Sequence, residues 1–309
     1  MLVRTIFRPS RIWQYVKLEI IVATVIAAAL VAAQQFGLDL SVPFGPLGVL
    51  GSAVAITMGF RNNTAYARWW EAQSAWGTIS NISRQYARLI VTFARSHSHQ
   101  TGYDEARAGA FIQSALHRQI AWIHVLRHTL RREPLSDDAL MYLDADEKQL
   151  VIGSVSPATT LLLRSGQHIY AAMANGTLQG FDSFQLEGCL SQLQIAQGSC
   201  EQIKNTPMPR QYAFFTTAFS WIFIVTMPFG LLSQFEISTA WVVIPLSIIL
   251  TFAFTIIDKI GQVTEEPFEG RVQDVPMTAI CRAIERELLE VLGAHPLPPA
   301  MEPHDGYLM

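Results

Sequence analysis

Four long apolar segments constrain this chain more than any other feature. They cover residues 20–36, 42–60, 212–235 and 237–257, and no Asp, Glu, Lys or Arg lies inside them. A helix of roughly 20 mostly apolar residues can cross the hydrocarbon core of a bilayer. Only 15% of all residues are charged, against about 25% in soluble chains. The sequence therefore predicts an all-α membrane protein with four transmembrane helices.

Basic residues indicate how these helices are oriented. They lie at the ends of each helix pair that are opposite the short connector: Arg4, Arg8, Arg11, Lys17, Arg61, Arg68, Lys204, Arg210 and Lys259. The short connectors 34–41 and 233–237 contain Asp39 and Glu236 but no Lys or Arg. Because basic flanks of membrane helices stay in the cytoplasm, we expect a multi-pass protein of the cell's inner (plasma) membrane. Both termini and the long middle segment should be cytoplasmic.

The remaining sequence has helical periodicity and no competing β alternation. Apolar residues recur at helical spacing within 65–96, 103–131, 157–173, 184–204 and 278–292, and the stretch REPLSDD (132–138) marks a stop. The tail from residue 293 contains four prolines and favours an extended chain. We expect five parts: a cytosolic N-terminal segment (1–19), transmembrane helices 1 and 2 (20–70), a large helical cytosolic domain (71–211), transmembrane helices 3 and 4 (212–257), and a cytosolic C-terminal loop, helix and tail (258–309).

Motifs typical of enzymes are missing from the sequence. It contains no GxGxxG, P-loop, HExxH or GxSxG pattern, so we expect no enzymatic activity and no cofactor. A formal net charge of −3 gives no sign of a nucleic-acid partner. Three cysteines without a CxxC pair provide no zinc framework, and Cys189 and Cys200 should be reduced in the cytoplasm.

Two groups of polar residues have competing interpretations. His117, His124 and His128 lie on one predicted helix, and the last two have the i, i+4 spacing that metal pairs use. Histidines buried between helices without a metal show the same pattern more often, since no Cys or carboxylate joins these three in sequence. Glu265 and Glu266 are adjacent and would suit a cation, although such pairs more often lie in solvated loops.

The second apolar segment carries the most informative pattern. Ser52, Ile56 and Phe60 stand at i, i+4 and i+8, which places them in one stripe along a helix. In a symmetric oligomer, one stripe per subunit would surround an axis and form an apolar constriction that gates by dewetting. Ordinary helix packing produces the same spacing, and small residues that allow close packing are present: Gly45, Gly48, Gly51, Ala53, Ala55 and Gly59. The uncharged segments and the lack of an inverted repeat disfavour a transporter.

Several motifs together resemble the bestrophin family in its bacterial form. The run GFRNNTAYARWWEAQSAWG (59–77) resembles the family signature at the cytoplasmic end of the second helix. FRPSRIWQYVKLEI (7–20), QGSCEQIKNTPMPRQY (197–212) and EEPFEGRVQDVPMTAIC (265–281) have family counterparts in the same order. This resemblance covers most of the chain. It implies a homopentameric ion channel in a lipid bilayer, with one axial pore lined by the second helix and a helical cytosolic vestibule.

The resemblance also assigns site residues. It places Ser52, Ile56 and Phe60 at the three rings of a pore neck. The family usually has apolar residues at all three levels, so the Ser52 hydroxyl should shorten the dry barrier. A second, cytosolic aperture falls at Phe181, or at Leu178 because the alignment through GTLQGFDS (176–183) is loose.

Ion selectivity does not follow from family membership, because animal bestrophins pass anions and a bacterial relative favours cations. Asp182 and Glu187 lie beside the expected aperture and, repeated in several subunits, would favour cations. Alternatively, both face solvent or pair with bases. We expect a passive channel for monovalent ions with a preference for cations. The alternatives are an anion (chloride) channel of the same architecture and a membrane-anchored scaffold that binds a soluble partner.

Calcium should not activate this channel. Animal members carry a calcium clasp built on an Asn-Pro-Phe-Gly step and a run of acids. Here Glu266 replaces the Asn, and Arg271, Val272 and Gln273 leave only Asp274 of the acidic run. Because Ca²⁺ takes six to eight oxygen ligands, several of them carboxylates, chelating calcium should leave the conductance in planar bilayers unchanged. Steep activation by micromolar calcium would contradict this prediction.

Overall fold

The computed structural model describes residues 9–100 and 102–303, and every regular element within them is a helix. The helices are α1 (Pro9–Gln35), α2 (Phe44–Ser96), α3 (Glu105–Arg131), α4 (Asp137–Leu140), α5 (Ala145–Ile152), α6 (Pro157–Ala174), α7 (Asp182–Asn205), α8 (Arg210–Leu232), the 3₁₀ turn η1 (Ala240–Val242), α9 (Val243–Thr264) and α10 (Met277–Val291). The all-α prediction is therefore confirmed.

These helices form two compact units. The membrane unit comprises residues 9–69 and 207–267, and the second unit comprises residues 70–206 and 268–303. Helix α2 is continuous and contributes its first part to the membrane unit and its remainder to the second unit. The boundary predicted after residue 70 is close to the observed boundary after residue 69. The side of the membrane on which each part lies stays a prediction.

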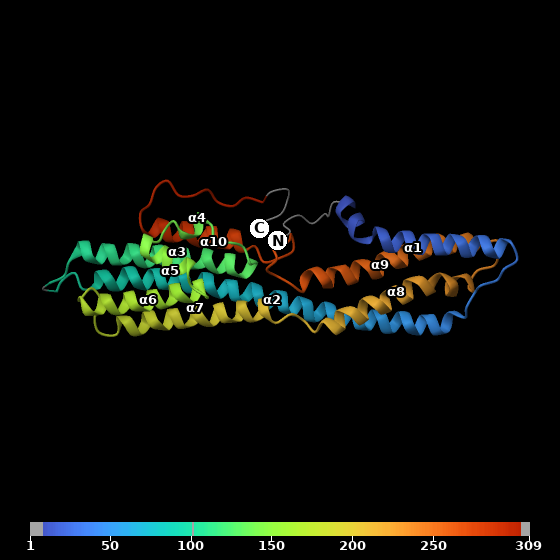
Figure 1. Ribbon diagram of the computed structural model, residues 1–309, viewed down its shortest axis with the longest axis horizontal. Helices are drawn as coiled ribbons and strands as arrows, with labels where there is room; N and C mark the ends of the chain where they lie inside the picture. Colours follow the sequence, from blue (N-terminus) through green and yellow to red (C-terminus); the bar gives the residue numbers. More distant parts are fainter. Residues whose placement is uncertain (1–8, 101, 304–309) are drawn as a thin grey trace. The chain divides into compact units, whose positions relative to one another are not determined.

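The membrane unit contains the four predicted transmembrane helices. Stretches of α1, α2, α8 and α9 are long and apolar enough to cross a bilayer, and α1 packs against α8 and α9 (Figure 1). Helix α1 begins at Pro9, ahead of the predicted membrane segment, because Lys17 and Glu19 exclude a segment from hydrocarbon without breaking a helix. The last apolar helical stretch covers Ala240–Thr264, where the sequence predicted a membrane segment over 237–257.

Glycines allow close contact between α2 and α8. A Cβ atom added at Gly51 would lie 2.7 Å from a ring carbon of Phe223 on α8, and one added at Gly230 on α8 would overlap Leu47. Val54 and Met58, on the same side of α2, join the buried apolar core of this unit. In a bilayer, where lipid tails are as apolar as Leu, helices associate through such close packing.

The second unit is built around α3. Every residue of this helix from Arg118 to Leu126 is buried, so neighbouring helices surround it. Its buried polar groups bond to neighbouring helices, as three examples show. Arg118 pairs with Glu147 on α5 at 2.8 Å. Gln119 Nε2 donates to Ser83 Oγ on α2 at 2.9 Å. Trp122 Nε1 donates to Gln197 Oε1 on α7 at 3.2 Å. These directional bonds add specificity to an otherwise apolar core.

The predicted helices of the second unit match the structure, and the sequence patterns missed two short helices, α4 and α5. Helix α5 has only eight residues, too few for a clear period. Its start had a signal nevertheless, because Asp144 stands three residues before Glu147 and accepts a hydrogen bond from its backbone N–H at 2.7 Å, as in a capping box. The described part of the tail after Gly293 is without regular structure, as expected, and Arg286 Nη1 donates to the carbonyl of Pro298.

Replacing Gly51 with Ala should destabilise the membrane unit, because the added methyl group must displace the Phe223 ring. Overpacking of this kind costs about 1–3 kcal/mol, so the melting temperature in detergent should fall by about 2–10 °C. Gly45→Ala is the matched control on the same helix, since an added Cβ there meets no described atom of the protomer within 4 Å. Equal melting temperatures for the two variants would contradict the close contact.

Candidate functional site

The three residues predicted to form the neck lie on one outward face of α2. Ile56 is 61% exposed and Phe60 is 69% exposed in the protomer, and Ser52 is exposed as well. Val54 and Met58 are buried on the opposite side. Ordinary packing within the chain therefore does not explain the stripe. The Ser52 hydroxyl donates to the carbonyl of Gly48 at 2.9 Å, and its oxygen still accepts hydrogen bonds.

A buried ion-pair cluster follows directly after Phe60. Arg61 Nη1 lies 2.9 Å from Asp258 Oδ1, and Nη2 lies 3.2 Å from Glu265 Oε2. The charge pattern had used Arg61 only as a basic residue flanking the second helix, and the structure shows that it is buried in ion pairs. Glu265 is neither part of a cation site nor solvated, because it pairs with Arg61. Asp258 and Glu265 are seven positions apart, two helical turns, and this spacing was the one signal in the sequence for such a cluster.

The structure distinguishes between the two candidates for the cytosolic aperture. Leu178 is fully buried, whereas Phe181 is 84% exposed. Phe181 also occupies the N-cap position of α7, where its ring cannot accept a hydrogen bond from the backbone N–H groups of the first turn. Of the two side chains, only that of Phe181 is available to line a passage. Its role in an aperture stays a hypothesis.

The expectation for Asp182 needs correction. Its side chain is only 14% exposed, and Oδ2 lies 2.8 Å from His97 Nε2. The same oxygen accepts a hydrogen bond from the backbone N–H of Gln179 at 3.0 Å. The carboxylate is thus held within the loop before α7 and is not free to line a passage. Glu187 is half-buried, and its Oε1 would be 3.1 Å from a Cβ added at Gly166 on α6.

The three histidines of α3 have separate partners. The His117 ring lies beside Tyr142, with ring centroids 5.3 Å apart. His124 Nε2 lies 3.2 Å from Glu285 Oε2, and His128 Nε2 lies 3.1 Å from Ser136 Oγ. Within residues 9–100 and 102–303, no three His, Cys, Asp or Glu side chains come together to hold a metal ion. The histidines connect α3 to its neighbours.

The surroundings of these groups also perturb their proton affinities. Burial, and then the charge of Arg127, lower the pKa of His128. Burial favours the neutral form of Glu285, but hydrogen bonds from His124 and Tyr142 outweigh it, and the pKa of Glu285 is lowered. Both shifts arise from contacts within the core of the second unit.

The segment that aligns with the calcium clasp does not fit calcium. Asp274 is buried, and its Oδ2 accepts a hydrogen bond from the backbone N–H of Arg271 at 2.9 Å. This burial raises the pKa of Asp274. Glu269 pairs with Lys204 on α7 at 2.6 Å. Because both carboxylates already have protein partners, the oxygen ligands that calcium requires are not assembled here.

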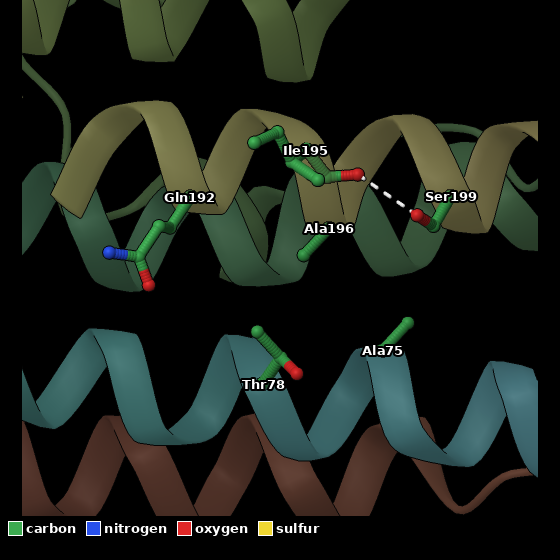
Figure 2. Close-up of a pocket in the computed structure, with 6 residues that line it drawn as sticks. All are labelled: Ala75, Thr78, Gln192, Ile195, Ala196 and Ser199. Carbon is green, nitrogen blue, oxygen red and sulfur yellow. Dashed lines mark hydrogen bonds between the residues drawn. The ribbon is translucent and has the colours of Figure 1, made fainter. Parts of the chain in front are cut away.

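A small groove of about 280 Å³ lies between α2 and α7 in the second unit (Figure 2). It is lined by neutral residues: Ala75, Thr78, Gln192, Ile195, Ala196 and Ser199. The Ser199 hydroxyl donates to the carbonyl of Ile195 within the same helix, at 3.1 Å. These side chains supply neither a nucleophile with a base nor a charged ligand group, so the groove offers no catalytic chemistry.

Comparisons with known proteins identify the family. A family model described as "Bacterial/Fungal Bestrophin protein" matches residues 2–290. The chain is 32% identical over 270 residues to the "Voltage-dependent anion channel-forming protein YneE" of Salmonella typhi, covering 87% of this chain and 84% of that protein. It is 30% identical over 282 residues to the "Voltage-dependent anion channel-forming protein mll4386" of Mesorhizobium japonicum, covering 91% and 85%.

A solved structure shows the same fold. The crystal structure of a bacterial bestrophin homologue from Klebsiella pneumoniae superimposes with a TM-score of 0.81 at 24% sequence identity. The match covers 90% of this chain and 99% of that chain.

Alanine variants at residues 178 and 181 should separate the two aperture candidates. Leu178→Ala removes a fully buried side chain and should lower stability by about 2–5 kcal/mol. Phe181→Ala removes an exposed ring and should leave the melting temperature unchanged within about 2 °C. Thermal unfolding of both purified variants checks this assignment, and a larger loss for Phe181→Ala would show that its ring is packed.

Proposed function

This chain belongs to the bacterial and fungal bestrophin family, a family of ion channels rather than enzymes, and from that premise we propose that it forms a homopentameric channel for passive flow of monovalent ions. The channel lies in the inner membrane of a bacterial cell, with both termini in the cytoplasm. A fivefold ring is the assembly that the family implies, and a single α2 helix cannot enclose a pore.

The observation that carries this proposal is the outward stripe on α2. Ile56 and Phe60 are exposed in the protomer although both are large and apolar. When copies of α2 surround an axis, these residues form rings of hydrocarbon surface. Water inside such a ring loses hydrogen bonds that the wall cannot replace, so the segment dries and an ion meets a desolvation barrier. The Ser52 ring is polar, so the barrier is centred on Ile56 and Phe60.

A second constriction at Phe181 is part of the proposal. The ring is exposed at the start of α7, next to a loop that Asp182 and His97 hold in place. An aromatic ring in each protomer narrows a passage without adding charge. This constriction therefore limits the size of the passing ion or molecule more than it selects the sign of the charge.

We propose anions as the permeant ions, which replaces the preference for cations. Ile56 and Phe60 carry no charge, so the neck itself does not select a sign. The preference for cations depended on Asp182 and Glu187, and the Asp182 carboxylate is held by His97. Relatives with about 30% identity are named anion channel-forming proteins. Cation conduction is the second candidate, and the half-buried Glu187 carboxylate is the observation that favours it.

Two measurements on the purified protein test assembly and selectivity. Native mass spectrometry should give about five times the monomer mass of 34.4 kDa. Unitary currents in planar bilayers with asymmetric NaCl should reverse near the equilibrium potential of chloride. Reversal near that of sodium would select the cation candidate. A dimer would exclude the axial pore, and a silent bilayer would favour the scaffold alternative.

The gate is tested at Ile56. Ile56→Ala should shorten the dry barrier and Ile56→Ser should wet it, so both should raise the current by about tenfold or more while the pentamer stays intact. Met58→Ala is the control two residues away, because Met58 is buried within the protomer. It should lower stability by about 2–5 kcal/mol without raising the unitary current. A destabilised Ile56→Ala pentamer with normal current would refute the gate.

A further inference from the structure

The two residues that follow Phe60 fasten α2 to α9. We infer that Arg61 is a positioning residue of the neck: its guanidinium, held by Asp258 and Glu265, fixes which face of α2 points outward. This inference rests on the proposed function, because it concerns the stripe of Ile56 and Phe60. We call Arg61, Asn62, Asp258 and Glu265 the Arg61 cluster.

Two adjacent residues of α2 make the contacts of the Arg61 cluster. The guanidinium uses separate nitrogens for Asp258, at 2.9 Å, and for Glu265, at 3.2 Å. Asn62 Nδ2 donates to the backbone carbonyl of Ile257 on α9 at 3.1 Å. The Asn62 amide also lies so close to Gly261 that a Cβ added there would overlap it. Side chain, backbone and glycine contacts therefore converge on the same short segment of α2.

The Arg61 cluster constrains rotation because its bonds are directional. A guanidinium is planar, and its fork of N–H donors matches carboxylate oxygens only in limited orientations. Successive residues on an α-helix are about 100° apart around the axis. The Arg61 side chain points into the membrane unit and is 4% exposed. The preceding residue, Phe60, therefore points away from the membrane unit. A rotation of α2 by one residue position would break both ion pairs.

The Arg61 cluster also keeps a positive charge away from the neck. Arg61 is adjacent to Phe60, so a freed guanidinium in each protomer would bring a ring of cations next to an apolar constriction. Asp258 and Glu265 compensate this charge, and Gln262 Nε2 donates to Asp258 Oδ2 at 2.8 Å, which occupies the second carboxylate oxygen. A separate pair, Lys259 with Glu19 on α1 at 3.6 Å, lies beside the cluster on α9 and does not involve α2.

Because the Arg61 cluster is buried, all of its charges must be paired at the same time. Removing one partner of a buried ion pair leaves the other charge without compensation, which is far less favourable than removing both. The cluster therefore need not add much stability to define one orientation of α2, since alternative orientations would leave Arg61, Asp258 and Glu265 unpaired in an apolar environment.

A double-mutant cycle on the full-length channel in planar bilayers tests this inference. Arg61→Gln should change the open probability by about fivefold or more, and Arg61→Lys, which keeps the charge but loses the fork, should have a smaller effect. In an Ile56→Ala/Phe60→Ala background, where both apolar rings of the neck are removed, Arg61→Gln should have no further effect. Lys259→Gln is the matched control, because it removes a cation next to Asp258, and its open probability should equal that of the unmodified protein.

The outcomes separate this inference from the proposed function. If the Ile56→Ala/Phe60→Ala variant raises the current but Arg61→Gln has no effect, or has the same effect in both backgrounds, the role of Arg61 is refuted and the neck stands. If the Ile56→Ala/Phe60→Ala variant leaves the current unchanged, both are refuted. Glu265→Gln repeats the cycle if Arg61→Gln fails to assemble, since the amide keeps an oxygen acceptor and Asp258 still pairs with Arg61.

Thiol labelling gives a second readout that does not depend on current. A cysteine at position 60, introduced as Phe60→Cys, should react with a charged methanethiosulfonate reagent, and adding Glu265→Gln should change that rate by about fivefold or more. The native cysteines are buried, and burial raises the pKa of both Cys200 and Cys281 to about 12, so they react slowly. An unchanged rate at position 60 would overturn the inference.

Discussion

The hydrogen-bonding demand of a backbone in hydrocarbon is the constraint on which the rest of this structure depends. Lipid tails offer no partner for N–H and C=O groups, so each membrane segment must satisfy them internally, as a helix does. Four such helices leave little freedom inside the membrane unit, and they associate through glycines such as Gly51 and Gly230. Because α2 continues without a break into the second unit, the same helix carries both the apolar stripe and part of the apolar core of the second unit.

Some buried polar groups of this structure stabilise the helix packing, and others fix the orientation of α2. Arg118 and Gln119 bond to neighbouring helices inside the core of the second unit. The Arg61 cluster differs, because it lies next to the residues that face outward and because its carboxylates come from another helix. A buried ion pair contributes little net stability once its desolvation is counted. Its persistence at this place is better explained by orientation than by stability.

Hydropathy and periodicity predicted most of the fold. The four spans and the long helices of the second unit were accessible from sequence because each has a long apolar run or a repeated apolar face. Helix α5 was missed because eight residues do not establish a period. Hydropathy reports the membrane portion of a helix, so it did not reveal that α1 begins at Pro9, ahead of the apolar run.

Only part of the candidate site could be predicted from hydropathy and periodicity. The stripe of Ser52, Ile56 and Phe60 follows from spacing along one helix, and the structure adds that these residues face outward. The partners of Arg61 lie 197 and 204 positions away, and His97 is 85 positions from Asp182. A local pattern contains no information on such pairs. The charges were therefore interpreted from their sequence neighbours, and the partners of Arg61 and Asp182 were not predicted.

At the N-terminus of α7, the residue type that would best stabilise the helix differs from the one that would narrow the proposed passage. Ser, Thr, Asp and Asn are the residues that cap a helix best, yet the N-cap here is Phe181. The helix forgoes a capping bond at the position where it exposes an aromatic ring. Asp182 partly compensates, since a carboxylate in the first turn interacts favourably with the helix dipole. Selection for stability alone would replace Phe181 with a small polar residue. If Phe181 forms the proposed constriction, substitution by a better capping residue would stabilise the helix and widen the passage, so a requirement for a narrow opening would keep the ring in place.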